Sequence, residues 1–519
     1  SALKTIARIS QYMLHKRWMV ALSVAFVLIS AGAGVAGTYF LKPLINEGIL
    51  PLVGKNVQLK DFEPFLRMIL GMSAIYLVGA LSSYAYSFLM IKVSNGTLNA
   101  IRKDMFNSMQ DAPIKYFDTH THGELMSRYT NDVDAVREAI SIGLSQLMAS
   151  CITIVGTFVM MLILSPVLTL MIVIMLFVMF TITRMVSSRS SMYFKKQQKV
   201  IGTVNGYIEE IIEGQKVVKV FGHEEEVKKA FAKLNEDLRM VATDANTYAN
   251  IMMPIMGNLS YLNYAFTAAV GAVMVITDRM DIGTIAAFLQ YTRSFSHPIA
   301  QISQQFNAIL AALAGAERIF EVIDENPEQD QGFVSLVNVA KEENCIISES
   351  KVCTGVWAWK YQQPDGTVTY TELTGNISFA NLNFGYEENK IVLHDISLFA
   401  KPGQKIALVG STGAGKTTIT NLLNRFYEVP KGKIFYDGID INDIKKDDLR
   451  SSLGMVLQDT HMFTDTVREN IRYGKLEATD DEVIEAAKLA NAHCFIMNLP
   501  QGYDTELVLD GANLSAGQR

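Results

Sequence analysis

Long stretches without any charged residue limit the fold of this chain more than any other feature. They run from Trp18 to Leu41, from Met68 to Ile91, from Ala139 to Thr183 and from Ala245 to Thr277. Each is longer than the roughly 20 residues that cross a bilayer as an α-helix. One such stretch could be a buried helix of a large soluble protein, but a series of them indicates a helical bundle embedded in a membrane.

The third stretch is long enough for two spans. Ser165-Pro166 lies in its middle, where proline disfavours a continuous helix, so we expect two antiparallel spans joined by a tight turn. A further, less apolar stretch from Ile282 to about Ala312 follows the polar turn 278–281. The chain is therefore expected to have six transmembrane helices, at 18–41, 68–91, 141–164, 166–186, 250–277 and 282–312.

Lysine and arginine are distributed unevenly between the two sides of this bundle. Lys16 and Arg17 precede the first span, and many basic residues fill segments 92–137 and 189–239, whereas the turns near Ser165 and Asp278 have almost none. Because basic residues favour the cytoplasmic side, both termini are predicted to be cytoplasmic, in a multi-pass protein of the bacterial cytoplasmic membrane. The first span is too long for a signal-peptide core and lacks a cleavage site, so we expect it to be retained.

Charge and cysteine content exclude some other classes of function. The formal net charge of −6 gives no indication of a nucleic-acid partner. The four cysteines show no spacing typical of a metal site, so we expect free thiols without an assigned role. They are Cys151, Cys345, Cys353 and Cys494.

The segments between spans two and three and between spans four and five are too long for loops and have helical patterning. In 200–238, apolar residues recur every three or four positions among charges, which predicts amphipathic helices that extend the spans into the cytoplasm. Gly214 and Gly222 delimit a short connecting element that could dock on another domain. The polar, breaker-rich segment 325–332 then ends the membrane part.

These boundaries predict a transmembrane domain at 1–325, a linker with a β-hairpin insert at 326–375, and a nucleotide-binding domain at 376–519. In the insert, alternation on both sides of Pro364-Asp365-Gly366 favours a hairpin with Trp357, Trp359 and Tyr361 on one face. This hairpin either packs on the nucleotide-binding domain or makes a regulatory contact.

A phosphate-binding loop follows the apolar run Ile406 to Val409, which we expect to be a buried strand. The loop fits the pattern G-x-x-x-x-G-K-[ST]. Its glycines let backbone N–H groups point at phosphate oxygens, while Lys416 adds positive charge and Thr417 offers a hydroxyl to Mg²⁺. A helix from Thr418 onward would complete the anion site with its N-terminus. The residues predicted to hold ATP here are Gly410, Ser411, Thr412, Gly413, Ala414, Gly415, Lys416, Thr417 and Thr418.

Six spans, long cytoplasmic extensions and a C-terminal phosphate loop together resemble a half-transporter of the ATP-binding cassette (ABC) exporter family, over nearly the whole chain. The resemblance implies an α-helical membrane domain followed by an α/β nucleotide-binding domain that uses ATP and Mg²⁺. It implies that Tyr386 stacks on adenine. It also implies that Gln458 reaches Mg²⁺ and the attacking water, and that Lys416 and Gln458 take part in hydrolysis.

The most specific match is the segment near the C-terminal end that resembles the family signature L-S-G-G-Q, in which the serine binds the γ-phosphate of ATP held by a partner subunit. Its residues are Leu514, Ser515, Ala516, Gly517 and Gln518. Ala516 stands where the family has glycine, and its methyl group would crowd the phosphate. Since some members pair two different halves and tolerate one altered signature, the resemblance favours a heterodimer. Residues 117–133 likewise resemble the first intracellular loop, whose short helix docks on the nucleotide-binding domain.

The family's catalytic glutamate and switch histidine follow the signature, so we expect them to lie beyond Arg519. On that interpretation the chain as given binds ATP without hydrolysing it, whereas the full-length protein is an ATPase. The run Leu507 to Asp510 has the look of the acidic strand but precedes the signature and is followed by Gly511, so a loop is expected there.

The last span contains a polar stripe on an otherwise apolar helix. Gln290, Arg293, His297, Gln301 and Gln304 recur at steps of three and four residues. The stripe either lines a translocation cavity that favours amphipathic or anionic cargo, or packs between subunits.

The family resemblance implies ATP-driven export of hydrophobic or amphipathic small molecules or lipids by alternating access. The partners would be a second half-transporter, the lipid bilayer and the cargo, with no nucleic acid. The alternative is an ATP-gated channel or a regulatory or degenerate partner subunit.

Overall fold

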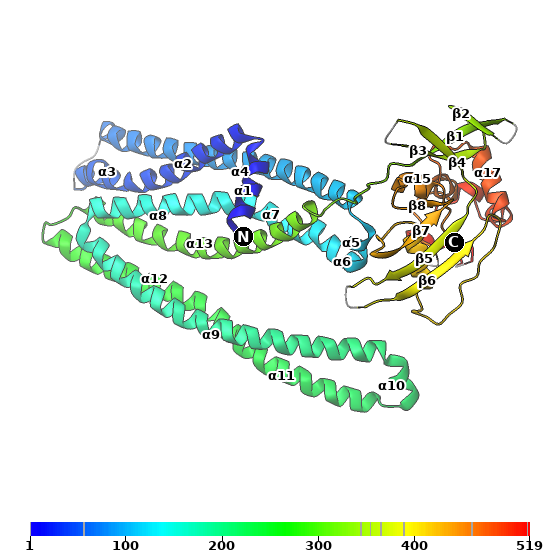
Figure 1. The fold of residues 1–519 in the computed structure, drawn as a ribbon. Helices are drawn as coiled ribbons and strands as arrows, with labels where there is room; N and C mark the ends of the chain where they lie inside the picture. The colour runs from blue at the N-terminus through cyan, green and yellow to red at the C-terminus, as the bar shows by residue number, and fades with distance from the viewer. Residues whose placement is uncertain are drawn as a thin grey trace. The chain divides into compact units, whose positions relative to one another are not determined.

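The computed structural model describes residues 2–54, 58–342, 345–352, 354–363, 366–387, 390–457, 460–515 and 517–519. The chain divides into two compact units, Ser1–Pro327 and Glu328–Arg519. The first is built of long helices and the second contains two β-sheets (Figure 1).

Helices of very different length make up the described part of the first unit. The membrane-length helices and their extensions are α2 (Arg17–Tyr39), α4 (Glu63–Asp111), α8 (Leu144–Leu164), α9 (Pro166–Glu213), α11 (Glu224–Asn250), α12 (Met252–Ile276) and α13 (Ile282–Ile323). The short helices are α1 (Ala2–Leu14), α3 (Leu41–Pro43), α5 (Ile114–Thr119), α6 (His122–Ser127), α7 (Val133–Glu138) and α10 (Gln215–Phe221). Short 3₁₀ or π segments join them at η1 (Leu44–Ile49), η2 (Leu50–Leu52), η3 (Leu59–Phe62), η4 (Arg128–Asp132) and η5 (Ala139–Gly143).

The turn predicted at Ser165-Pro166 is present. Ser165 is the N-cap of α9, where its hydroxyl accepts a hydrogen bond from the Leu168 N–H at 3.4 Å, and Pro166 occupies the first helical position. Proline is favoured there because the N–H that it lacks would have no partner in the helix. Asp281 caps α13 in the same way, accepting from the Thr284 N–H at 2.6 Å.

Five helical segments among the described residues are long and apolar enough to cross a membrane. They are Arg17–Leu52, Glu63–Asp111, His122–Leu164, Pro166–Glu213 and Glu224–Ile276. These contain the first five predicted spans, except for Thr277 at the end of the fifth. The sixth predicted span lies on α13, which is a continuous helix of 42 residues but is less apolar because of its glutamines and Arg293.

Two of the spans continue as helix well past the expected membrane boundary. α4 extends from the predicted span end at residue 91 to Asp111, and α9 extends from residue 186 to Glu213. α9 runs beside α12 and then α11, and the short α10 joins α9 to α11 (Figure 1). Gly214 ends α9, and Gly222 ends α10 in the left-handed conformation at φ 66°. The helical extension and the short connecting helix are present as predicted, while their place in the cytoplasm stays a prediction.

The N-terminal helix α1 is fastened to α4 and to the C-terminal end of α13. Arg8 pairs with Asp324 through two hydrogen bonds of 2.5 and 2.6 Å, and the Tyr12 hydroxyl donates to Asp104 at 2.7 Å. Burial and this acceptor raise the pKa of Tyr12 to about 12. α1 therefore holds the last turn of α13, from which the chain leaves toward the second unit.

Within its described residues, the second unit contains two four-stranded sheets, ordered β2-β1-β3-β4 and β6-β5-β7-β8, and all of these pairings are antiparallel. The strands are β1 (Ser335–Glu342), β2 (Cys345–Glu349), β3 (Trp357–Gln362), β4 (Val368–Glu372), β5 (Ile377–Phe384), β6 (Leu393–Ala400), β7 (Lys431–Tyr436) and β8 (Ile439–Asp440). The helices are α14 (Lys416–Leu423), α15 (Lys446–Ser451), α16 (Val467–Arg472), α17 (Asp480–Leu489) and α18 (His493–Met497), with 3₁₀ turns η6 (Gly502–Asp504) and η7 (Leu509–Gly511).

The insert forms the first sheet, and β3 and β4 are the hairpin expected around Gly366. Trp359 is fully buried in the same core as Phe379 and Tyr436 of the second sheet, and its indole N–H donates to Asp437 at 3.1 Å. The insert therefore packs on the second sheet, which agrees with the interpretation of a hairpin packed on the nucleotide-binding domain. Trp357, predicted on the same face, is 40% exposed.

The prediction of a buried strand immediately before the phosphate loop is wrong. Residues 404–410 have no strand hydrogen bonding, and Val409 is 94% exposed. Val456, in the later apolar run, is 95% exposed. A strand buried on both faces requires a hydrogen-bonded neighbour along its edge, and the described residues provide none there.

The polar linker after α13 is held to the second unit by ion pairs. Glu328 accepts two hydrogen bonds from Arg450, at 2.6 and 2.8 Å, and Asp330 accepts one from the Lys446 N–H at 2.8 Å. Although burial opposes the shift, Arg450 and Lys446 keep the pKa of Glu328 below its ordinary value. The linker is thus ordered from residue 328 onward.

Candidate functional site

The phosphate loop has backbone geometry that strongly favours glycine at two of its positions. Gly413 and Gly415 both have φ of 85°, in the left-handed region. A Cβ atom on Gly415 would lie 2.5 Å from the Cδ2 of Leu393, a buried residue at the start of β6. The sharp turn and the close packing against β6 therefore both depend on Gly415.

The loop is folded around its own lysine. The Lys416 ammonium donates to the carbonyls of Gly410 and Ser411, at 2.9 and 2.8 Å. α14 begins at Lys416, so the free N–H groups of its first turn lie at the same end of the loop as this positive charge. The remaining loop residues Thr412 and Ala414, like Thr417 at the start of the helix, are exposed and accessible to a ligand.

Tyr386 is placed directly beside the helix that follows the loop. Its hydroxyl donates to the Thr418 side chain at 3.1 Å, and its ring meets Tyr427 edge-on at 4.9 Å and Phe384 at 5.1 Å. The ring remains 40% exposed. The structure therefore brings an exposed aromatic side chain and the phosphate loop together, as a nucleotide with a flat base and a charged tail requires.

The signature segment belongs to a different hydrophobic core. Leu514 is buried with Val467, Val483, Ile496 and Leu507, next to α16–α18. The exposed Ser515 begins a turn that two hydrogen bonds to Gln518 close. The Gln518 side chain accepts from the Ser515 N–H, and the Gln518 backbone N–H donates to the Ser515 carbonyl. Gly517 is exposed, with open space where a Cβ would be. The serine is thus presented to solvent, away from the core of the phosphate loop.

The run Leu507 to Asp510 is a loop, as predicted. Asp510 has φ of 57° within a 3₁₀ turn, and its side chain accepts from the Met462 N–H at 3.0 Å. This backbone hydrogen bond and His461 lower the pKa of Asp510. Its carboxylate fastens two loops and does not end a strand.

Some predicted site residues lie outside the described residues, namely Gln458 and Ala516, and the side chain of His297. Cys353 and the side chain of Cys345 also lie outside them, whereas Cys151 and Cys494 are free and exposed.

Comparison with known proteins agrees with this arrangement. The family described as ABC transporter transmembrane region matches residues 20–299, and the family described as ABC transporter matches residues 393–519. The chain belongs to the ABC transporter family. Its membrane domain is helical and is followed by the sheet-containing nucleotide-binding domain, as the resemblance implied. Membership assigns ATP binding to the second unit and ATP hydrolysis coupled to transport to the protein family.

Several relatives match along most of their length. The uncharacterized ABC transporter ATP-binding protein YfiC of Bacillus subtilis is 38% identical over 515 residues, which cover 99% of this chain and 79% of YfiC. The fatty acid ABC transporter ATP-binding/permease protein of Mycobacterium bovis is 35% identical over 90% of this chain and 69% of its own length. The ATP-dependent lipid A-core flippase of Pseudomonas aeruginosa is 33% identical over an alignment that covers 100% of this chain and 81% of the flippase.

In the membrane unit, the polar stripe of α13 is divided between solvent-accessible and packed positions. Gln290, Arg293 and Gln304 are exposed in this chain. Gln301 instead accepts hydrogen bonds from Gln146 at 2.6 Å and from Ser150 at 3.3 Å, both on α8. Part of the stripe therefore joins α13 to α8, and part remains available to a cavity or a second subunit.

The C-terminal part of α13 is joined to η4 by a buried carboxylate. Asp132 in η4 is 5% exposed and accepts two hydrogen bonds from Arg318, at 2.9 and 2.5 Å. The same loop contains Arg128, which donates to the Tyr116 hydroxyl at 3.0 Å and to Glu124 at 2.9 Å. Burial raises the pKa of Tyr116 although Arg128 opposes it. The loop that resembles a coupling element is thus internally braced and tied to α13.

Sequence reasoning missed the residues that support the site from a distance. They are Leu393 beneath Gly415, Tyr427 beside Tyr386, Gln146 beside Gln301, and the pair of Asp132 with Arg318. Each contact joins segments that are far apart in sequence, so neither motif nor periodicity could indicate it.

Proposed function

We propose that this chain is one half of a dimeric exporter that uses ATP to move hydrophobic or amphipathic small molecules or lipids out of the cytoplasmic leaflet by alternating access. The observation that supports this most is the assembled phosphate loop with Tyr386 at its side, in one chain with a bundle of membrane-length apolar helices. Relatives named as a fatty acid transporter and a lipid A-core flippase favour lipid-like cargo.

In this proposal ATP lies between Tyr386 and the phosphate loop, and Mg²⁺ is held by Thr417 and Gln458. Lys416, released from the carbonyls of Gly410 and Ser411, would bind the phosphates instead. Ser515 and its neighbours would bind the γ-phosphate of ATP on the partner's loop. ATP drives the change only if it stabilises the closed pair of domains over the open pair, because equal affinity for both shifts nothing.

Two features support a paired arrangement with both termini in the cytoplasm. α10 exposes Val217, Val220 and Phe221, which are 60%, 80% and 69% exposed and suit docking on another nucleotide-binding domain. Ala516 in place of the signature glycine favours a different half-transporter as the partner. The membrane is then the bacterial cytoplasmic membrane, with the basic extensions of α4 and α9 on the cytoplasmic side.

The test is nucleotide-driven transport by the full-length protein, alone and with a co-expressed second half-transporter, in proteoliposomes. Vanadate-sensitive uptake of a fluorescent lipid against its gradient, lost in Lys416→Ala, is the expected result. Movement of the lipid only down its gradient, gated by ATP binding, would contradict an exporter and indicate a channel. Uptake that needs the second half-transporter supports a heterodimer, whereas equal uptake without it contradicts one.

A further inference from the structure

A polar pocket lies between α4 and the segment from α7 to the start of α8. Its volume is about 360 Å³, within the range of small-molecule sites. Its polar lining includes Tyr86, Ser87, Asn95, Arg137, Ser145 and Gln146. Among the nine described residues that line it, one is basic and none is acidic. We call it the boundary pocket.

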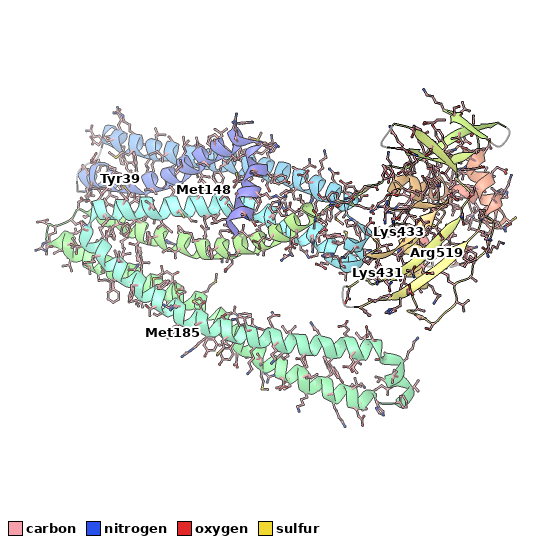
Figure 2. The ribbon with its side chains drawn as sticks, in the orientation of Figure 1. Tyr39, Met148, Met185, Lys431, Lys433 and Arg519 are labelled. Atoms are coloured by element: carbon pink, nitrogen blue, oxygen red, sulfur yellow. The ribbon has the colours of Figure 1, made fainter. Side chains whose placement is uncertain are left out.

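The pocket is at the expected level of the cytoplasmic membrane surface. The predicted span on α4 ends at residue 91, and the predicted span on α8 begins at residue 141, so the lining residues lie on both sides of that boundary. Ile91 and Ile142, also in the lining, are 51% and 57% exposed. Met148, two residues after Gln146, marks this part of α8 in Figure 2. A pocket at this level can contact both the polar head group of a lipid and the first methylene groups of its acyl chain.

The charge in the pocket is that of a single guanidinium. Arg137 donates through Nε to Asp134 at 3.1 Å, and the two side chains are 51% and 58% exposed. An exposed ion pair of this kind is weak, about 0–1 kcal/mol, so it leaves Arg137 able to bind a second anion with the rest of its planar fork. The hydroxyls of Tyr86 and Ser87 and the amide of Asn95 are neutral hydrogen-bonding groups. One cation with neutral donors matches a singly charged carboxylate better than a doubly charged phosphate monoester.

The pocket is also joined to the polar stripe of α13. Gln146, in its lining, donates to Gln301 at 2.6 Å. A head group bound in the pocket therefore lies one hydrogen-bonded pair away from α13, whose polar stripe is predicted either to line a translocation cavity or to pack between subunits.

We propose that the boundary pocket binds the carboxylate of a single-chain amphiphile, such as a long-chain fatty acid, drawn from the inner leaflet. Arg137 binds the carboxylate, and Ile91 and Ile142 contact the first methylene groups of the chain. This inference deepens the proposed exporter function and rests on it for the direction of transport, but binding itself can be measured separately.

The experiment compares a fluorescent polyene fatty acid with the alcohol of the same chain, bound to the intact transporter in nanodiscs of neutral lipid. We expect the wild-type protein to prefer the acid by about tenfold, the worth of one charge-assisted hydrogen-bonded pair. Arg137→Gln should remove this preference. The matched control Arg189→Gln changes an exposed arginine that lies just past the predicted end of the α9 span, and should keep both the preference and the basal ATPase rate.

A second variant guards against a folding defect. Asn95→Leu keeps a side chain of similar size on exposed α4 surface and should weaken acid binding while alcohol binding is kept. Equal acid preference in wild type and Arg137→Gln would overturn the proposal, as would tighter binding of an alkyl phosphate than of the acid. Vanadate-sensitive ATPase is measured on the same samples: its absence would refute the exporter function, whereas loss of acid preference alone would refute only the pocket.

Discussion

Replacing Gly415 by alanine tests how the phosphate loop is built. At φ of 85°, a residue with a Cβ atom pays about 1–2 kcal/mol. The new Cβ would lie 2.5 Å from the Cδ2 of Leu393, and forcing such an overlap into a packed core typically adds about 1–3 kcal/mol. Together these terms oppose the ATP-competent loop by roughly 2–5 kcal/mol, which corresponds to at least about a 30-fold loss of affinity.

The assay is equilibrium binding of a fluorescent ATP analogue to the purified protein. Gly403→Ala is the matched control, because Gly403 has φ of 74° with open space around it and lies outside the loop. The Gly403→Ala variant has a similar backbone strain without a steric overlap, and its ATP affinity should stay within about twofold of wild type.

A double substitution separates the two terms. Leu393→Ala removes the atom that Gly415→Ala would overlap, so the double variant should bind ATP more tightly than Gly415→Ala alone and less tightly than Leu393→Ala alone. Near-normal affinity of Gly415→Ala, or no recovery in the double variant, would refute the steric reasoning.

Three further predictions follow from buried polar contacts. Asp132→Asn weakens the pair with Arg318 and should lower the stimulation of ATPase by transported lipid several-fold more than Asp244→Asn on the exposed surface of α11; equal effects would contradict a coupling role. Trp359→Phe removes the hydrogen bond to Asp437 and should destabilise the nucleotide-binding domain by about 1–3 kcal/mol, measured as a lower thermal unfolding temperature. The pKa of Glu328 is lowered from 4.5, so the stability that its ion pairs add is present above pH 4.5 and is lost as the pH falls through the pKa of the folded state. Glu328→Gln should remove this loss of stability at acid pH, as measured by unfolding curves over a series of pH values.

Local features of the sequence were sufficient to predict the helical part. The charge-free stretches gave the spans because a helix satisfies its own backbone hydrogen bonds and needs only an apolar surface to lie in lipid. The break at Ser165-Pro166 and the element bounded by Gly214 and Gly222 were equally predictable, since proline and glycine act through their own backbone. The phosphate loop was recognisable for the same reason.

The strand expected at 406–409 shows where this reasoning fails. An apolar run can become a central strand only when neighbouring strands hydrogen-bond to it, so its own pattern does not decide the outcome. The contact of Gly415 with Leu393 and the pair of Asp132 with Arg318 are of the same kind. Each depends on where a distant segment is placed, which a single sequence does not show.

α13 combines both kinds of information in one element. Its polar stripe was visible in the sequence, but the structure shows that Gln301 joins α13 to α8 while Arg318 joins it to η4. Gln301 and Arg318 are 17 positions apart on this one helix, about 25 Å at 1.5 Å per residue. Because a helix of this length moves as a stiff rod, a shift of the loop at Asp132 must also move Gln301 or break one of the two contacts. The pairing of Asp132 with Arg318 is therefore the contact at which nucleotide-driven movement is expected to reach the polar stripe.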